Sequence, residues 1–316
     1  MKEWVRPILL ATLILASFSY FTLTTEPFLS PLNLSNLVTH MSELLLIALP
    51  MTAIMISGGI DLSVGSTFSL SAVILGLTWS ATDSMPLALT ASLLVALLAG
   101  LINGTSIAYL RIPPLLVTLA TMSTYRGIAL GLGGAHSMGG YPDWFLSLGT
   151  GQWRQIPNQT LLLFPCLLLS WILMEKTALG RQIYLMGSGE RLAFYTGIPV
   201  ARRKLFLYIW SGFMAGLAGI LFVARVSTAK ANYGAGIELH AITAVVLGGT
   251  SISGGHGSLM GTFLGLLLIR ILLRGMELNN ILTEWQIVAV GALLICSSLG
   301  DRLFAWAGHT LRQRRA

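Results

Sequence analysis

The sequence predicts an all-α integral membrane protein that crosses the bilayer many times. Its mean hydropathy is +0.78 and only 10% of its 316 residues are charged, which excludes an ordinary soluble domain. Apolar stretches of about 20 residues, the length that crosses a bilayer, recur from one end of the chain to the other. We therefore expect a single transmembrane domain over residues 1–316.

Ten apolar stretches are expected to cross the membrane as helices. The first could be mistaken for a signal peptide, since Lys2 and Arg6 precede its apolar core. No small-residue cleavage site follows it and further spans come at once, so we expect it to be retained. The stretch at 238–253 is weak because glycine interrupts it. The expected spans are 7–25, 36–57, 64–80, 86–109, 113–134, 160–175, 205–226, 238–253, 257–274 and 285–300.

The basic residues indicate which side of the membrane each loop faces. With ten spans and a cytoplasmic N-terminus, 13 of the 19 Lys and Arg residues fall inside, as the positive-inside rule expects, and the C-terminus is cytoplasmic too. This distribution argues against nucleic-acid binding, although the net charge is +7. The thirteen are Lys2, Arg6, Arg111, Lys176, Arg181, Arg191, Arg202, Arg203, Lys204, Arg302, Arg312, Arg314 and Arg315.

Two hydrophilic loops are long enough to do more than connect spans. The external loop, about 135–159, carries Tyr141, Trp144 and Trp153 with few charges. Aromatic residues beside spans often mark the interfacial belt, so this loop is either an amphipathic segment on the membrane surface or a lip that touches a delivery protein. The cytoplasmic loop, about 175–204, is the longest internal loop and the most basic.

Within the cytoplasmic loop we expect a short helix from Glu190 to about Tyr195. Ser188 is placed to cap it, and Gly197 and Pro199 are placed to end it. A short stiff helix held off the membrane suits a docking element for a soluble partner. The alternative is a solvated connector that its positive charge keeps inside.

A turn rich in glycine and serine, SGGIDLSVGS at 57–66, separates the second and third expected spans. Glycine frees the backbone there. Because 36–57 already crosses the bilayer, we place the turn at the cytoplasmic end, where Asp61 is expected to cap the following helix near its positive dipole end rather than bind a solute. The residues of this helix-break motif are Gly58, Gly59, Asp61, Ser63 and Gly65.

A second glycine-rich turn faintly repeats the first. Transporters are often built from repeats, and the two turns are consistent with a duplicated half. The matches are Ile60, Gly65 and Ser66 with Ile252, Gly257 and Ser258, each 192 residues later.

Polar and ionisable residues inside spans are functional candidates because they are costly there. His40 and Glu43 form either a proton relay or metal site, or a pair in the outer headgroup region. The fifth span carries a polar stripe that must face protein or water, and it either contacts a hydroxylated solute or joins helices. We favour a translocation path for this stripe. Its candidate residues, with one from the fourth span, are Asn103, Thr118, Thr121, Tyr125 and Arg126.

The chain carries none of the sequence motifs of a catalytic subunit. It has no GxxxxGK[ST] loop, no GxSxG elbow and no HExxH pair. Cys166 and Cys296 lie in expected spans without metal-ligand spacing, which favours a role as small buried apolar residues. We expect no enzyme activity, metal or cofactor on this chain; if ATP drives transport, another chain must hydrolyse it.

Three segments resemble the ribose-type permeases of bacterial ABC importers, a group that also includes xylose, arabinose, galactose, rhamnose and autoinducer-2 permeases. The segments are SGGIDLSVGS at 57–66, ALGRQIYLMGSGERLAFYTGIPVARRK at 178–204 and ITAVVLGGTSISGGHGSLMGTFLG at 242–265. The resemblance covers nearly the whole chain in matching order. Its motifs are specific to the group and not to one substrate.

The resemblance implies an inner-membrane permease subunit with three kinds of partner: a second permease copy or paralogue, a cytoplasmic ATPase dimer and a periplasmic sugar-binding protein. It implies that the cytoplasmic loop carries the coupling helix that docks in the ATPase. One departure is that relatives usually have Gly-Gly-Asn where this chain has Gly187-Ser188-Gly189. The coupling residues would be Gly187, Glu190, Arg191, Ala193, Tyr195 and Gly197.

We therefore expect a permease that moves a small sugar or sugar-like solute into the cytoplasm by alternating access, driven by ATP that a partner hydrolyses. The alternative is a secondary transporter in which protons are coupled through residues in or beside the spans. It predicts uptake that follows the proton gradient without an ATPase. Its candidate proton carriers are His40, Glu43, Asp61 and Arg126.

Overall fold

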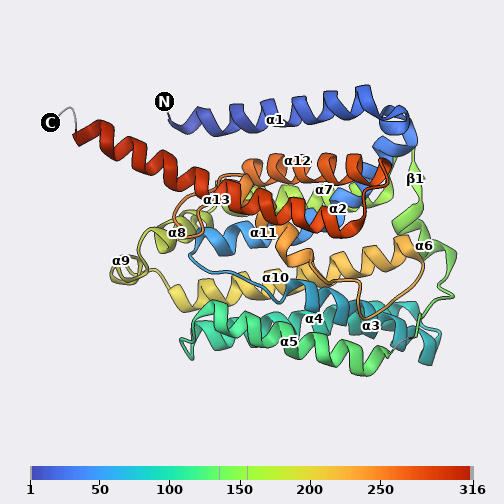
Figure 1. Ribbon diagram of the computed structural model, residues 1–316. Coiled ribbons are helices and arrows are strands. Elements are labelled where there is room, and N and C mark those ends of the chain that lie inside the picture. The colour runs from blue at the N-terminus through green and yellow to red at the C-terminus, as the bar shows by residue number, and fades with distance from the viewer. Residues whose placement is uncertain (1, 135, 155, 314–316) are drawn as a thin grey trace.

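A bundle of long helices lying roughly side by side forms the body of the protein in a computed structural model that describes residues 2–134, 136–154 and 156–313 (Figure 1). The helices are α1 (Lys2–Thr24), α2 (Pro31–Ile56), α3 (Val64–Thr82), α4 (Met85–Ala108), α5 (Pro114–Gly133), α6 (Asp143–Thr150), α7 (Asn158–Trp171), α8 (Ala178–Ser188), α9 (Glu190–Tyr195), α10 (Val200–Val226), α11 (Ile237–Leu247), α12 (Leu259–Leu278) and α13 (Thr283–Gln313). A 3-10 turn (Glu26–Leu29) precedes α2, and a π-helical turn (Ile172–Lys176) follows α7. The short strands β1 (Gln152–Trp153) and β2 (Ile156–Pro157) pair antiparallel.

Each of the ten expected spans lies on a helix, so the all-α membrane fold is confirmed. Within the described residues, seven helices are long and apolar enough to cross a membrane: α2, α3, α4, α5, α7 with its π turn, α10 and α12. The apolar stretches of α1, α11 and α13 are shorter, so a count of ten crossings is not established. The expected span at 238–253 stops early because α11 ends at Leu247, where the glycine run begins.

The helices α2 and α10 form the centre of the bundle. The apolar window of α2 is 89% buried inside the protein, whereas the windows of α5 and α7 are 22% buried. A helix that is apolar on all sides belongs inside a membrane bundle, and a peripheral helix directs its leucines to lipid. The polar residues that are buried along α2 and α10 are therefore surrounded by protein and not by lipid.

Glycines bring α4 and α10 into direct backbone contact. A Cβ added at Gly212 would collide with the carbonyl oxygen of Ala96, and one at Gly100 would collide with that of Tyr208. Between apolar helices in lipid, small residues allow the close approach that van der Waals packing requires. The backbones of α4 and α10 are thus fixed against each other without intervening side chains.

The two long loops lie at opposite ends of the bundle. The helices α8 and α9 project at the end toward which the first residues of α1 and the last residues of α13 point, and α6 and β1 lie at the other end (Figure 1). This arrangement agrees with termini and a coupling loop on one side of the membrane and an external loop on the other. The side chains of the second basic cluster, Arg302 to Arg315, lie outside the described residues.

The external loop contains α6 and the β1–β2 hairpin. Trp144 and Trp153 are exposed and Tyr141 is buried. The isolated bridge between Met138 and Ala229 joins this loop to the segment after α10. Exposed tryptophans suit both a membrane-surface segment and a lip for a delivery protein, so the two alternatives stay open.

We predict that Gly212→Ala destabilises the protein because the added methyl group meets the backbone of α4. Overpacking of this kind costs about 1–3 kcal/mol. Gly127→Ala on α5 is the matched control, since a Cβ there meets nothing within 4 Å. Thermal unfolding of both variants in detergent measures the difference. Equal stability of the two variants would contradict the close contact.

Candidate functional site

The predicted helix break after the second span is present. Helix α2 ends at Ile56, and Gly58 has a φ of 85°, a conformation that favours glycine. The N–H of Gly58 donates to the carbonyl oxygen of Met55, and the N–H of Gly59 donates to that of Ile54. This pattern of backbone bonds closes the last turn of a helix.

Two further glycines of the motif permit close approach. A Cβ at Gly59 would lie 2.7 Å from the hydroxyl of Tyr208 on α10. A Cβ at Gly65 would collide with the carbonyl oxygen of Gly234, before α11. The turn is therefore enclosed by the protein on both sides.

Asp61 is only 2% exposed and accepts three hydrogen bonds from neighbouring residues. Its Oδ1 accepts from the backbone N–H of Ser63 at 3.0 Å and from the Ser63 hydroxyl at 2.7 Å, and its Oδ2 accepts from the Ser211 hydroxyl at 2.8 Å. A buried carboxylate is tolerated only with such donors. Asp61 thereby ties the turn to α10.

The expectation that Asp61 caps α3 is wrong. Ser63 is the residue before the helix, and no side-chain cap bond is made there. Asp61 instead bonds to the N–H two residues ahead, which is an Asx turn. Its carboxylate shapes the turn itself rather than the first turn of the helix.

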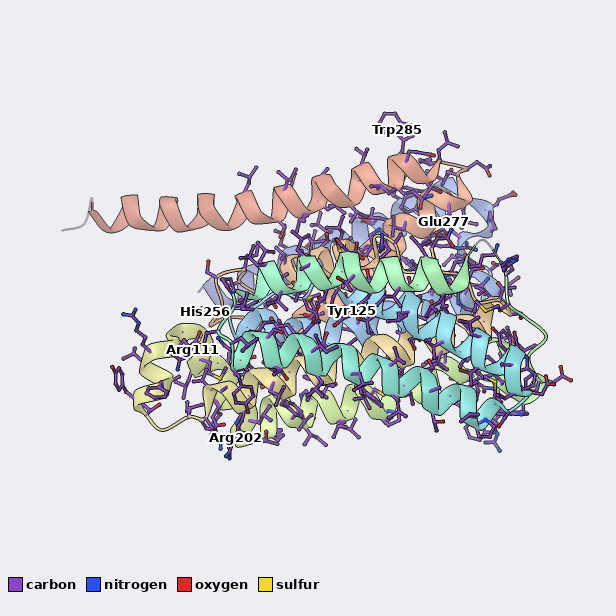
Figure 2. All side chains as sticks on the ribbon, turned by 90° about the horizontal axis from the view of Figure 1, so that it is seen from below. Arg111, Tyr125, Arg202, His256, Glu277 and Trp285 are labelled. Atoms are coloured by element: carbon purple, nitrogen blue, oxygen red, sulfur yellow. The ribbon has the colours of Figure 1, made fainter. Side chains whose placement is uncertain are left out.

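The Asp61 network extends to α4 and α5. Asn103 Nδ2 donates to the Ser63 hydroxyl at 2.7 Å, and the Tyr125 hydroxyl donates to Asn103 Oδ1 at 3.4 Å. Thr118 Oγ1 lies 3.2 Å from the carbonyl oxygen of Ile60 and 2.9 Å from that of Pro114 in its own helix, so its single proton is shared between the turn and α5. Figure 2 shows Tyr125 in the interior, away from either end of the bundle. Side chains of three helices, α4, α5 and α10, thus converge on one turn.

The five candidate path residues divide into two groups. Asn103, Thr118 and Tyr125 are buried and join helices through the Asp61 network, which is the second of the two alternatives for the polar stripe. Thr121 donates to its own helix at Val117, and one guanidinium nitrogen of Arg126 has no hydrogen-bond partner among the described residues. A path role stays a prediction for the second group.

A glycine junction joins this turn to the loop at 175–204, which we expect to be cytoplasmic. We use this name for Ile56–Gly58, Gly187 and Gly254–Gly255. A Cβ at Gly187 would collide with the carbonyl oxygen of Ile56, and Gly255 N–H donates to the same oxygen at 2.9 Å. A Cβ at Gly254 would lie 3.1 Å from the Cα of Gly58. Helix α8 and the turns after α2 and before α12 therefore meet backbone to backbone.

Tyr184 adds a side-chain contact beside the junction. Its hydroxyl donates to the carbonyl oxygen of Gly257 at 2.9 Å. Burial, with a smaller contribution from the charge of Glu175, raises the pKa of Tyr184 to about 12. The hydroxyl therefore keeps its proton at neutral pH and remains a donor.

The two glycine-rich turns end their preceding helices in the same way. After α11, the N–H of Gly249 donates to Val246 and that of Thr250 donates to Val245. These bonds repeat the pattern at Gly58 and Gly59. Both turns also contribute to the glycine junction, which agrees with the repeat hypothesis without testing a common origin.

The expected short helix is present as α9. Ala193 is buried in a small cluster with Met186, Ile198 and Val200 that fixes α9 to α8. Gly197 has a φ of 82° and follows the end of the helix.

Charged residues of α9 take separate roles. Glu190 pairs with Lys204 at 2.7 Å, and Arg191 is exposed. The expectation that Ser188 caps α9 is wrong. Ser188 is the last residue of α8, and its hydroxyl donates to the backbone carbonyl oxygen of Tyr184. Gly189 occupies the N-cap position of α9 without a side-chain hydrogen bond.

Sequence reasoning missed two features of the site. One is the exposure of Leu192 (71%) and Phe194 (67%) on α9, which form an apolar surface with the expected coupling residue Tyr195 (82%). The other is Arg225, which binds both carboxylate oxygens of Glu43 at 2.8 and 3.0 Å. The sequence could have identified Arg225 as a candidate, because it is a charged residue inside the expected span at 205–226.

Glu43 pairs with Arg225 inside the protein, and His40 lies beside this pair. His40 Nε2 lies 3.5 Å from Arg225, and Gln159 donates to Glu43 at 3.3 Å. No group of His, Cys, Asp and Glu suited to a metal occurs in the described part of the chain.

Both cysteines are free, and Cys296 is exposed on α13, so its expected burial is wrong.

Comparison with known proteins identifies the family. The profile of the branched-chain amino acid transport system / permease component family matches residues 33–298. The chain belongs to this permease family. The expected resemblance to ribose-type ABC permeases is thus confirmed, and the chain is a multi-pass permease subunit of an importer and not an enzyme. Permeases of this kind act with ATPase and substrate-binding partners.

Among curated relatives, the permease resembles the autoinducer 2 import system permease protein LsrD of Yersinia enterocolitica, Escherichia coli K12 and Shigella flexneri. Each is 38% identical over 261 residues, which cover 81% of this chain and 79% of the relative. No solved structure matches the permease.

We predict that Ser211→Ala destabilises the permease because it leaves one oxygen of the buried Asp61 without its donor. The expected loss is about 1–3 kcal/mol of unfolding free energy, measured by thermal unfolding in detergent. Ser123→Ala is the control, since Ser123 is exposed and donates only within α5. If the two variants unfold alike, Asp61 does not depend on α10.

Proposed function

We propose that this permease carries a small hydroxylated solute, a sugar or an autoinducer-2-like compound, across the bacterial inner membrane into the cytoplasm. ATP would be bound and hydrolysed by a separate cytoplasmic ATPase dimer. The observation that carries the proposal is the glycine junction, which links the segment exposed to a soluble partner with the turn on which side chains of α4, α5 and α10 converge. The names of the relatives support an import direction and this solute class.

The end that carries α8 and α9 is proposed to face the cytoplasm, with both termini. Arg111, Arg202 and His256 lie at this end and Glu277 lies toward the other (Figure 2). Clusters of Lys and Arg beside spans are retained on the cytoplasmic side.

The exposed surface of α9 is the proposed ATPase contact. Aromatic and aliphatic side chains exposed together mark protein interfaces, and a short helix seated in a groove is a recurrent docking mode. Leu192, Phe194 and Tyr195 form this surface, while Ala193 faces inward and fixes α9 to α8.

Movement of α9 would pass through α8 to the glycine junction. Because Gly187 meets Ile56 and Gly255 without intervening side chains, α8 cannot shift without displacing the turns after α2 and before α12. The first of these turns holds Asp61, whose bonds reach α10 and, through Ser63, α4. Nucleotide-driven motion would in this way change the helix arrangement around the solute path.

Two further partners are proposed: a second permease subunit, either a copy or a paralogue, and a periplasmic solute-binding protein. Gly127 and Gly131 lie four residues apart on α5, and a Cβ at either would meet nothing within 4 Å. Small residues at this spacing suit contact with another transmembrane helix. The external loop with Trp144 would meet the binding protein.

The proton-coupled alternative is less favoured. Of its four candidate groups, Asp61 and Glu43 are each held by several hydrogen-bond donors, and those donors hold helices together. A carboxylate fixed in this way serves structure better than a cycle of proton uptake and release.

We predict that the double variant Leu192→Ser, Phe194→Ser loses the ATPase partner. Exposed apolar residues at the centre of an interface commonly reduce affinity about thirtyfold or more when truncated. Co-purification of the ATPase and ATP-dependent uptake of labelled ribose or autoinducer-2 into proteoliposomes are the measurements. Membrane insertion should be unchanged.

The control is Trp153→Ser, another exposed apolar residue, at the opposite end of the bundle. It should keep the ATPase. Normal co-purification by the double variant would refute the α9 contact, and uptake driven by a proton gradient without ATP would refute the ATP-driven mechanism.

A further inference from the structure

An apolar groove of about 500 Å³ opens between α7 and α12 on the outside of the bundle, away from the Asp61 network. Both flanking helices pack on α2. Four of the lining side chains are well exposed: Phe164, Leu168, Trp171 and Met260. The full lining is Phe164, Leu167, Leu168, Trp171, Glu175, Ser258, Leu259, Met260 and Phe263.

The wall of the groove formed by α7 and the π turn has the length of one leaflet of a bilayer. Its lining on α7 and the π turn runs from Phe164 to Glu175, eleven positions along the chain. At 1.5 Å per residue this is about 16 Å. Half of a hydrocarbon core of about 30 Å is about 15 Å. A chain lying in the groove would therefore reach from the headgroup level to near the middle of the membrane.

The residues at the Glu175 end of the groove indicate that this end lies at the level of the lipid headgroups. Trp171 has the amphipathic ring that is enriched at the membrane interface, and Lys176 Nζ lies 4.9 Å from the centre of that ring. Glu175 is the single charged residue of the lining. Because Lys176 is held over Trp171, the charge that faces the groove is the carboxylate of Glu175.

We propose that this groove binds an acyl chain of a membrane phospholipid whose amine-bearing headgroup, as in phosphatidylethanolamine, contacts Glu175. The ammonium of ethanolamine complements the carboxylate, and the phosphate beside it can approach Lys176. A phosphatidylglycerol headgroup has no cation to offer Glu175.

A lipid fits this groove better than a helix from another protein. Helices that associate in membranes meet through small residues, which let their backbones approach. The groove lining has no glycine or alanine and consists mainly of large flexible or aromatic side chains. The small residues that suit a helix partner, Gly127 and Gly131, lie on α5 instead.

A lipid in this place would touch the elements that lead to the cytoplasmic loop. Glu175 belongs to the π turn, and α8 packs on that turn so closely that a Cβ at Gly180 would collide with the carbonyl oxygen of Met174. Ser258, on the other wall, follows Gly257, which Tyr184 binds from α8. The lipid would therefore contact the two elements that hold α8 in place, which are the π turn and the turn before α12.

The test is lipid retention by the full-length permease, which needs neither ATPase nor solute and therefore fails or succeeds independently of the proposed transport function. The protein is reconstituted in bilayers with equal amounts of phosphatidylethanolamine, phosphatidylglycerol and phosphatidylcholine, extracted in mild detergent, and its bound lipids are counted by native mass spectrometry. The wild type should retain phosphatidylethanolamine over phosphatidylglycerol about fivefold, the effect of one charge contact near the membrane surface.

Three variants separate the parts of the proposal. Leu168→Trp fills the groove and should abolish retention, whereas Leu161→Trp, an exposed residue of α7 outside the lining, should not. Glu175→Gln should keep a bound lipid but lose the preference for phosphatidylethanolamine. Melting temperatures confirm that each variant is folded.

Three results would overturn the proposal. Equal retention by Leu168→Trp and Leu161→Trp would show that the lipid lies elsewhere. An unchanged preference in Glu175→Gln would refute the headgroup contact. A change of oligomeric state in Leu168→Trp, with lipid retention unaffected, would assign the groove to a second copy of the chain.

Discussion

The structure depends on the hydrogen bonds of one buried carboxylate. Asp61 lies among apolar helices where water cannot replace a lost donor, so Ser63 and Ser211 must both stay in place. Because Ser63 also receives a bond from Asn103, the same turn fixes α10 and α4. A single charged side chain thus sets the relative positions of helices that hydrophobic burial alone would allow to slide.

Glycine supplies the second constraint, because it replaces side-chain contacts with backbone contacts. Side chains can change rotamer and absorb a displacement, whereas two backbones in contact move together. The contacts of Gly187 with Ile56 and Gly255 have this character, as do those of Gly212 on α10. The α8–α9 segment, the proposed contact for a soluble partner, is therefore linked rigidly to the Asp61 network.

Much of the fold could be predicted from the sequence, because membrane helices leave a strong hydropathy signal. The break at Gly58 and the short helix from Glu190 to Tyr195 follow from local glycine and proline signals and are present. The roles of Asn103 and Tyr125 could not be decided, since a polar stripe looks the same whether it faces a solute or another helix. Which helix lies opposite is tertiary information that one sequence does not contain.

Arg225 illustrates the same limit of prediction from one sequence, which does not identify the partner of a buried group. A charge inside a span indicates that a partner exists, but not that the partner is Glu43, 182 positions earlier in the chain. The pair joins α2 to α10 in the half of the bundle away from α8, and the Asp61–Ser211 bond joins the turn after α2 to α10 nearer to α8. Because α2 and α10 are fixed to each other at two levels, they form a rigid unit. If the proposed solute path rearranges, we expect the movement in the peripheral helices, where α5 carries Thr121 and Arg126, one of whose guanidinium nitrogens has no hydrogen-bond partner among the described residues.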